Sequence, residues 1–149
     1  MNRKWMKKLL AWLALFVWMA VIFYFSHQSG DVSTQISDGV LNTVLSFLPN
    51  LFDYAFFSYI IRKFAHFTEY FILGILVYHL MNQYRFVSKK EFIWMILFCV
   101  IYAISDEFHQ LFIGGRSPKI FDVMIDSLGS CCALALLSFK TKNKSYENS

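Results

Sequence analysis

Four long apolar runs constrain the fold of this chain more than any other feature of its sequence. They cover residues 9–25, 64–81, 92–108 and 121–139. A helix rises 1.5 Å per residue, so about 20 residues cross the roughly 30 Å hydrocarbon core of a bilayer. Flanking aromatic residues bring each run close to that length. The alternating ten-residue segments of a membrane barrel are not seen. The sequence therefore predicts an all-α integral membrane bundle of four transmembrane helices.

The composition supports a membrane protein and argues against a nucleic-acid partner. Hydrophobic residues make up 57% of the 149 residues and charged residues only 16%, whereas soluble domains carry about 25% charge. The net charge of +4 comes from short cationic clusters beside apolar runs, where cations mark membrane edges. We expect one domain over residues 1–140 and a polar, disordered cytoplasmic tail over residues 141–149.

The distribution of cations predicts the orientation of the spans. The first run follows a basic segment but is not succeeded by an A-x-A cleavage site, so it is predicted to remain as an anchor. An even number of spans places both termini on one side. Ten of the fourteen Lys and Arg residues then share that side, which the positive-inside rule makes cytoplasmic. The other four are expected outside: Arg62, Lys63, Arg116 and Lys119.

The first outer connection, residues 26–61, contains a second kind of helical pattern. Apolar residues recur at helical spacing, and Pro49-Asn50 ends the pattern. They are Ile36, Val40, Leu41, Val44, Leu45 and Leu48. This pattern predicts an additional amphipathic helix at the membrane interface or over the bundle. The aromatic-rich residues 51–61 are interpreted as an interfacial approach to the second span. The cysteines Cys99, Cys131 and Cys132 are expected to be small apolar residues without disulfides.

Polar residues within the spans supply the candidate site. Arg62, His66 and Glu69 share one face of the second span, because they are four and three residues apart. Near the outer end of the third span, Asp106, His109 and Gln110 share a face, while Glu107 points about 100° away. Which of the two acids faces the bundle interior stays open.

The stretch after the third span turns the chain back into the membrane. Gly114-Gly115-Arg116 breaks the helix, and Ser117-Pro118 predicts an N-cap followed by proline in the first turn of the fourth span. Asp122 and Asp126 then share a face, and Gly129 on the same side would allow another helix to approach. Ionisable groups at such depth are costly unless paired. Either a structural ion-pair network or a functional outward-facing cavity accounts for them.

These residues resemble the VanZ family of small membrane proteins. The resemblance rests on Phe25-Ser26-His27-Gln28-Ser29-Gly30, Arg62-Lys63-x-x-His66-Phe67-x-Glu69-Tyr70, Ser105-Asp106-Glu107-x-His109-Gln110, Gly115-Arg116, and Asp122 with Asp126 and Gly129. His27 departs from the pattern, in which a small hydroxyl residue is expected. The resemblance implies a protein of the bacterial cell envelope, and the founding member of the family is linked to resistance to the glycopeptide teicoplanin.

Three functional hypotheses follow. In the first, an outward cavity engages an amphiphilic or lipid-linked ligand through Arg62, Lys63, Gln110, Arg116 and Asp122. In the second, the protein is an enzyme acting on a lipid-linked envelope substrate, with metal-dependent or His/Asp chemistry. Its candidate catalytic residues are His66, Glu69, Asp106, Glu107, His109 and Asp126. The third is a proton-coupled carrier, which is the least favoured because four short spans are few for a transporter without oligomerisation. The cofactor, the metal and the oligomeric state are not defined by the sequence.

Overall fold

The computed structural model describes residues 2–46, 53–84 and 87–147, and side chains through residue 141. This part of the chain forms five helices and no strand: α1 (Arg3–Ser26), α2 (Gly30–Leu45), α3 (Tyr54–Asn82), α4 (Lys89–Gln110) and α5 (Ile120–Glu147). α1, α3, α4 and the segment of α5 through Thr141 are long and apolar enough to cross a membrane. The predicted all-α fold with four spans is confirmed.

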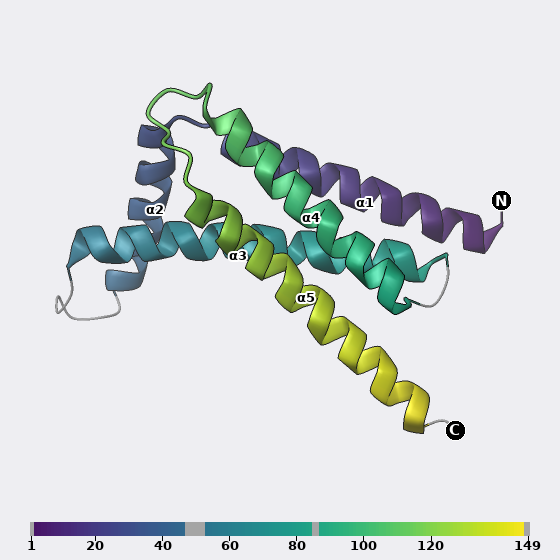
Figure 1. Ribbon diagram of the computed structural model, residues 1–149. Helices are drawn as coiled ribbons and strands as arrows, with labels where there is room; N and C mark the ends of the chain where they lie inside the picture. The colour runs from purple at the N-terminus through teal and green to yellow at the C-terminus, as the bar shows by residue number, and fades with distance from the viewer. Residues whose placement is uncertain (1, 47–52, 85–86, 148–149) are drawn as a thin grey trace.

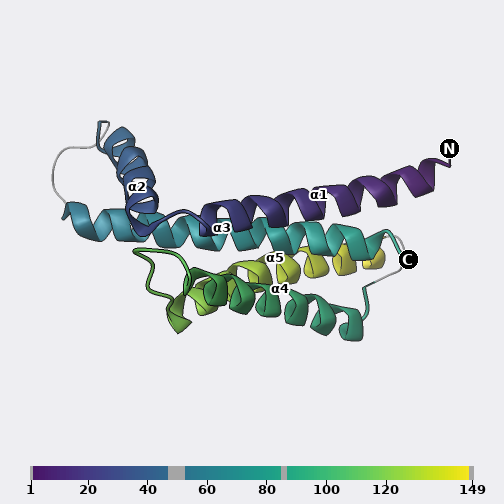
Figure 2. The same cartoon turned by 90° about the horizontal axis from the view of Figure 1, so that it is seen from above.

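The two termini lie at the same end of the bundle, and α2 lies across the opposite end (Figure 1). Seen from above, α3 occupies the middle, with α1 on one side and α4 and α5 on the other (Figure 2). α3 contacts all four other helices, and its most extensive interface is with α5. The end that carries α2 is called the α2 end below.

Close helix packing around α3 depends on small residues. A Cβ atom on Gly129 of α5 would lie 2.3 Å from the carbonyl oxygen of Phe67 in α3. A Cβ atom on Gly74 of α3 would lie 2.7 Å from the carbonyl oxygen of Ser130 in α5. One glycine from each helix thus lets the two backbones approach, as the position of Gly129 predicted. The buried core beside this contact includes Tyr70, Leu73, Met95, Cys99 and Leu134.

Hydrogen bonds of indole and phenol groups help to attach α1 to the bundle. The Trp18 indole donates to the carbonyl oxygen of Glu69 at 2.9 Å, and the Trp12 indole donates to the Tyr84 hydroxyl at 2.8 Å. The Tyr102 hydroxyl donates to the carbonyl oxygen of Met19 at 2.8 Å. Most other apolar side chains of α1 face outward, such as Phe16 and Leu13. Such a surface suits hydrocarbon, where exposed apolar groups carry no penalty.

The predicted amphipathic helix exists as α2, but it begins at Gly30, six residues before Ile36. Ser29 caps it, since its hydroxyl accepts a hydrogen bond from the N–H of Val32. Leu41 is buried against the bundle, whereas Ile36, Val40 and Val44 are exposed. The predicted Leu48 and the Pro49-Asn50 stop lie outside the described residues.

Two further boundaries differ from the predictions. Residues 54–61 are the first turns of α3 and not a separate approach, because Asp53 caps the helix through the N–H of Ala55 at 3.0 Å. The tail predicted to be disordered from residue 141 is helical through Glu147. Residues 141–147 contain no glycine or proline. Lysines near a helix C-terminus stabilise the helix through a favourable interaction with its dipole. The three cysteines are free, as predicted.

Candidate functional site

The site lies at the α2 end, where two connections meet backbone to backbone. The N–H of Gly30, at the start of α2, donates to the carbonyl oxygen of Gly114 at 3.2 Å. A Cβ atom on Gly30 would lie 1.9 Å from the carbonyl oxygen of Gly115. Gly115 has a φ of 72°, which glycine adopts at no steric cost. The α1–α2 turn therefore rests directly on the loop of residues 111–119.

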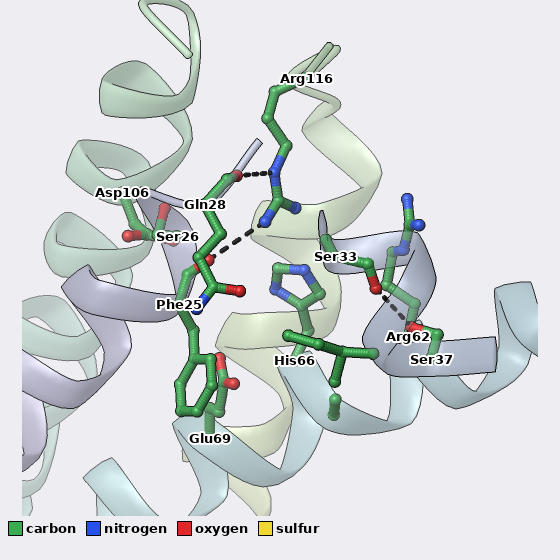
Figure 3. Close-up of a pocket in the computed structure, with 12 residues that line it drawn as sticks. Phe25, Ser26, Gln28, Ser33, Ser37, Arg62, His66, Glu69, Asp106 and Arg116 are labelled. Atoms are coloured by element: carbon green, nitrogen blue, oxygen red, sulfur yellow. Dashed lines mark hydrogen bonds between the residues drawn. The ribbon is translucent and has the colours of Figure 1, made fainter. Parts of the chain in front are cut away.

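Arg116 projects from this loop and braces the end of α1. Its Nε donates to the carbonyl oxygen of Gln28 at 3.0 Å, and its Nη2 donates to that of Phe25 at 3.1 Å (Figure 3). The C-terminal carbonyls of a helix carry partial negative charge, which favours a cation there. Burial, followed by the positive charge of Arg62, lowers the pKa of Arg116 from its usual value. A guanidinium remains charged in spite of this.

Arg62 enters the same region from α3. One of its terminal nitrogens, Nη2, donates to the hydroxyl of Thr34 in α2, and its buried Nε has no hydrogen-bond partner. Among the described residues, no carboxylate lies within ion-pair distance of Arg62 or of Arg116. Two guanidinium groups thus face one region without direct neutralisation.

His66 and Asp126 form the deepest polar contact of the site. His66 Nδ1 lies 3.5 Å from Asp126 Oδ1, and the Asp126 side chain is 0% exposed. Neither carboxylate oxygen of Asp126 has a hydrogen-bond partner. Burying an acid this way is costly unless a neighbour compensates it, and His66 is the neighbour in place. An imidazole beside a buried acid can also take or give a proton.

Lys63 and Asp122 form a second pair, joining α3 to the first turn of α5. The Lys63 ammonium contacts Asp122 Oδ1, and the two side chains are only 12% and 11% exposed. The ammonium also lies 5.0 Å from the centre of the Tyr59 ring, within the range of a cation–π contact. This pair ties the two central helices together near the mouth of the site.

The two adjacent acids of α4 have different surroundings. Asp106 accepts a hydrogen bond from the Gln110 amide at 3.3 Å and lines a cavity. Glu107 instead accepts one from the N–H of Lys119 at 2.9 Å and holds the 111–119 loop. The predicted N-cap at Ser117 is wrong by two residues. Glu107 fixes Lys119, whose carbonyl oxygen accepts from the N–H of Asp122 at 2.8 Å, so α5 starts at Ile120.

Two cavities open around these groups, with volumes of about 210 Å³ and about 190 Å³. Arg62, His66 and Arg116 line both. Figure 3 shows the first cavity, with His66 and Glu69 on the wall formed by α3. Its remaining lining residues are Phe25, Ser26, Gln28, Ser33, Ile36, Ser37, Ala65, Glu69 and Asp106. The second cavity adds Tyr59, Lys63, Gln110, Gly115, Ser117, Lys119 and Asp122.

Most candidate residues predicted from the sequence line these cavities, but Glu107, His109 and Asp126 do not. Asp126 instead contacts His66, and Glu107 holds the 111–119 loop. His109 lies apart from the site. Its Nε2 lies 3.1 Å from Nδ1 of His27, and its ring packs 4.5 Å from that of Phe23. It therefore joins α4 to α1. Five further residues of the site were not predicted from the sequence: Ser26, Gln28, Ser33, Thr34 and Ser37. Ser26 and Gln28 belong to the motif of residues 25–30, which was the available signal.

The described side chains contain no group of three His, Cys, Asp or Glu residues placed to hold a metal ion. The residues that the metal hypothesis would bring together instead have different contact partners. His66 faces Asp126, His109 faces His27, and Glu107 holds the 111–119 loop. The chemistry that the arrangement offers directly is anion binding by guanidinium groups and proton exchange at His66.

Comparison with protein families gives one result. The family model described as VanZ/LLP1 matches residues 11–141. No curated protein and no solved structure matches the chain. The matched segment includes the four candidate spans apart from the first turns of α1, and every residue of the two cavities.

Proposed function

The chain belongs to the VanZ/LLP1 family and is a multi-span membrane protein, and from this premise we propose that it binds the anionic headgroup of a membrane amphiphile. The observation that carries the proposal is the pair Arg62 and Arg116, which lines both cavities without a carboxylate partner among the described residues. Guanidinium groups match phosphate and carboxylate oxygens in bidentate geometry. Burial and then the charge of Arg62 lower the pKa of Arg116, and an anion between the two guanidinium groups would relieve the second of these effects.

The proposed site faces away from the cytoplasm. Both termini lie at the end opposite α2 (Figure 2). Two cationic clusters lie at the same end of the bundle as the termini. They are Arg3, Lys4, Lys7 and Lys8 at the start of α1, and Lys89 and Lys90 at the start of α4. The positive-inside rule therefore supports cytoplasmic termini and outward-facing cavities in the cell membrane. Gln110, Lys63 and Asp122 would form the outer wall of the ligand site.

Lipid-linked components of the envelope and acylated antibiotics belong to the ligand class that this site fits. Each combines an apolar chain, which the bilayer accepts, with a polar headgroup at the membrane edge. Teicoplanin carries an acyl chain that less lipophilic glycopeptides lack. We propose that the protein contributes to teicoplanin resistance through the same arginines.

Replacing Arg62 by Gln should weaken binding of phosphatidic acid about tenfold or more, because a hydrogen bond to a charged group contributes about 1.5–3 kcal/mol. Arg62→Lys should retain part of the affinity, since it keeps the charge but loses the planar fork. The measurement is native mass spectrometry of purified protein in micelles, titrated with phosphatidic acid against phosphatidylcholine.

Arg3→Gln is the matched control, because it removes the same charge at the other end of the bundle and should leave binding unchanged. Equal phosphatidic acid affinity for Arg62→Gln and wild type, with both folded, would refute the proposed headgroup site. In cells that express the proteins at equal levels, wild type and Arg3→Gln should protect best against teicoplanin. Arg62→Lys should protect less, and Arg62→Gln least.

A second candidate function, acid–base catalysis on the bound headgroup, is favoured by the His66–Asp126 contact at 3.5 Å. Under this alternative, wild-type proteoliposomes should convert an anionic lipid to a new product. His66→Gln should slow conversion by about 10²-fold or more with lipid affinity kept within about threefold. Mass spectrometry of the lipids makes the measurement. Binding with no change in lipid composition would leave only the binding function.

A further inference from the structure

The two cavities share three residues but have different walls. Arg62, His66 and Arg116 line both. The first cavity is reached past the end of α1, α2 and the first half of α3. The second is reached past the loop of residues 111–119 and the start of α5. The shared residues therefore stand at the boundary between two spaces that open toward different parts of the molecule.

The first cavity has exposed apolar residues in its lining, and these continue an apolar surface. Its apolar lining residues are Phe25, Ile36 and Ala65. Phe25 is 40% exposed and Ile36 is 45% exposed. Ile36 also belongs to a stripe of exposed residues at four-residue spacing along α2: Val32, Ile36, Val40 and Val44. Residues at this spacing share one helix face. The outward apolar face of α2 therefore runs directly into the cavity.

The second cavity has no aliphatic side chain in its lining. Its residues outside the shared three are Tyr59, Lys63, Gln110, Gly115, Ser117, Lys119 and Asp122. Charged and amide groups are costly to place against hydrocarbon and are compensated by water or by polar partners. Residues 115–119 form its edge, and the loop to which they belong connects the ends of two spans. This wall suits the aqueous side of the membrane interface.

We infer that the site has two separate entrances, one from hydrocarbon past Phe25 and Ile36 and one from water past Ser117 and Lys119. This inference rests on the proposed function and extends it by assigning the parts of the ligand. The hydrocarbon chain of the bound amphiphile occupies the first entrance. Its headgroup lies at Arg62 and Arg116, and the second entrance admits water or a polar second molecule to the headgroup.

Hydroxyl groups also belong to the lining of the first cavity. Ser26, Ser33 and Ser37 line it together with the two arginines. The Ser37 hydroxyl already donates to the carbonyl oxygen of Ser33 at 3.0 Å. The lining of the first cavity thus combines apolar contacts, hydroxyl groups and positive charge. That combination suits an amphiphile, which has a hydrocarbon chain and a charged headgroup.

Spin labels on single introduced cysteines test the two entrances without a ligand. Ile36→Cys and Phe25→Cys probe the first entrance, and Ser117→Cys probes the second. Ile101→Cys, on the exposed face of α4, is the hydrocarbon reference, and Gln83→Cys, after the end of α3, is the water reference. Unsubstituted protein, carrying its three native cysteines, gives the blank. The measurement is the relaxation of each label in reconstituted vesicles. Relaxation by dissolved oxygen, which enters hydrocarbon, is compared with relaxation by a water-soluble nickel chelate.

The labels at residues 36 and 25 should follow the Ile101 reference, with oxygen relaxing them several-fold more than nickel. The label at residue 117 should follow the Gln83 reference. Nickel-dominated relaxation at both first-entrance positions, or oxygen-dominated relaxation at residue 117, would overturn the inference. Phosphatidic acid, but not glycerol phosphate, should then immobilise the label at residue 36. If the labels show the expected oxygen and nickel accessibilities but phosphatidic acid does not immobilise the label at residue 36, the two entrances are supported and the proposed lipid binding is contradicted.

Discussion

Gly129→Val is expected to abolish the close packing of α3 and α5 and to destabilise the protein by about 3 kcal/mol or more. The added Cβ alone would lie 2.3 Å from the Phe67 carbonyl oxygen and 3.2 Å from the Phe71 amide nitrogen. Both contacts are backbone atoms within α3, so no side-chain rotation relieves them. The helices must separate, and the His66–Asp126 contact at 3.5 Å separates with them.

Leu128→Val is the matched control, because it places the same side chain one residue earlier on an exposed position of α5. Thermal unfolding in detergent, followed by tryptophan fluorescence and size-exclusion chromatography, compares the two variants. The control should unfold within about 2 °C of wild type, and Gly129→Val should unfold far lower or fail to give a monodisperse protein. A Gly129→Val variant as stable as its control would contradict the proposed importance of this contact.

The span architecture was predictable because it depends on local sequence alone. A helix crosses the membrane where an apolar run is long enough and where all backbone groups can form hydrogen bonds within the helix. All four predicted runs lie inside observed helices. The ends were less predictable, because tertiary contacts decide them. Ser117 carries a favourable capping side chain, yet α5 starts at Ile120 after Glu107 binds the Lys119 amide. No local pattern encodes a partner twelve residues away.

The candidate site was predictable to the level of residues that share a helix face. Arg62, His66 and Glu69 were expected together at three- and four-residue spacing, and they line one cavity. The same rule grouped His109 with Asp106, but His109 turns toward His27 of the α1 end. Residues three apart still lie about 60° apart around a helix, so Asp106 can line the cavity while His109 meets α1. The serines of α2 could not be predicted as site residues, because only the fold of the α1–α2 turn brings them to the cavity.

Lys63→Met should destabilise the protein by about 3 kcal/mol, whereas the double variant Lys63→Met/Asp122→Leu should recover most of that loss. The two side chains are almost fully buried and in contact. Removing one partner leaves an uncompensated buried charge, while replacing both with apolar groups is often close to neutral. Asp122→Leu alone should cost less than Lys63→Met. The lysine can extend its ammonium toward the interface and keep its Tyr59 contact, whereas the short aspartate cannot leave α5.

Unfolding in mixed micelles gives the coupling free energy of this cycle, for which we expect at least about 1 kcal/mol. Lys90→Met, an exposed lysine at the start of α4, should have no effect. The same double variant separates packing from ligand binding. Because Asp122 already neutralises Lys63, we expect the double variant to lose less phosphatidic acid affinity than Arg62→Gln. A folded double variant that loses binding would show that the pair contacts the headgroup, and additive single effects would show that the charges act independently.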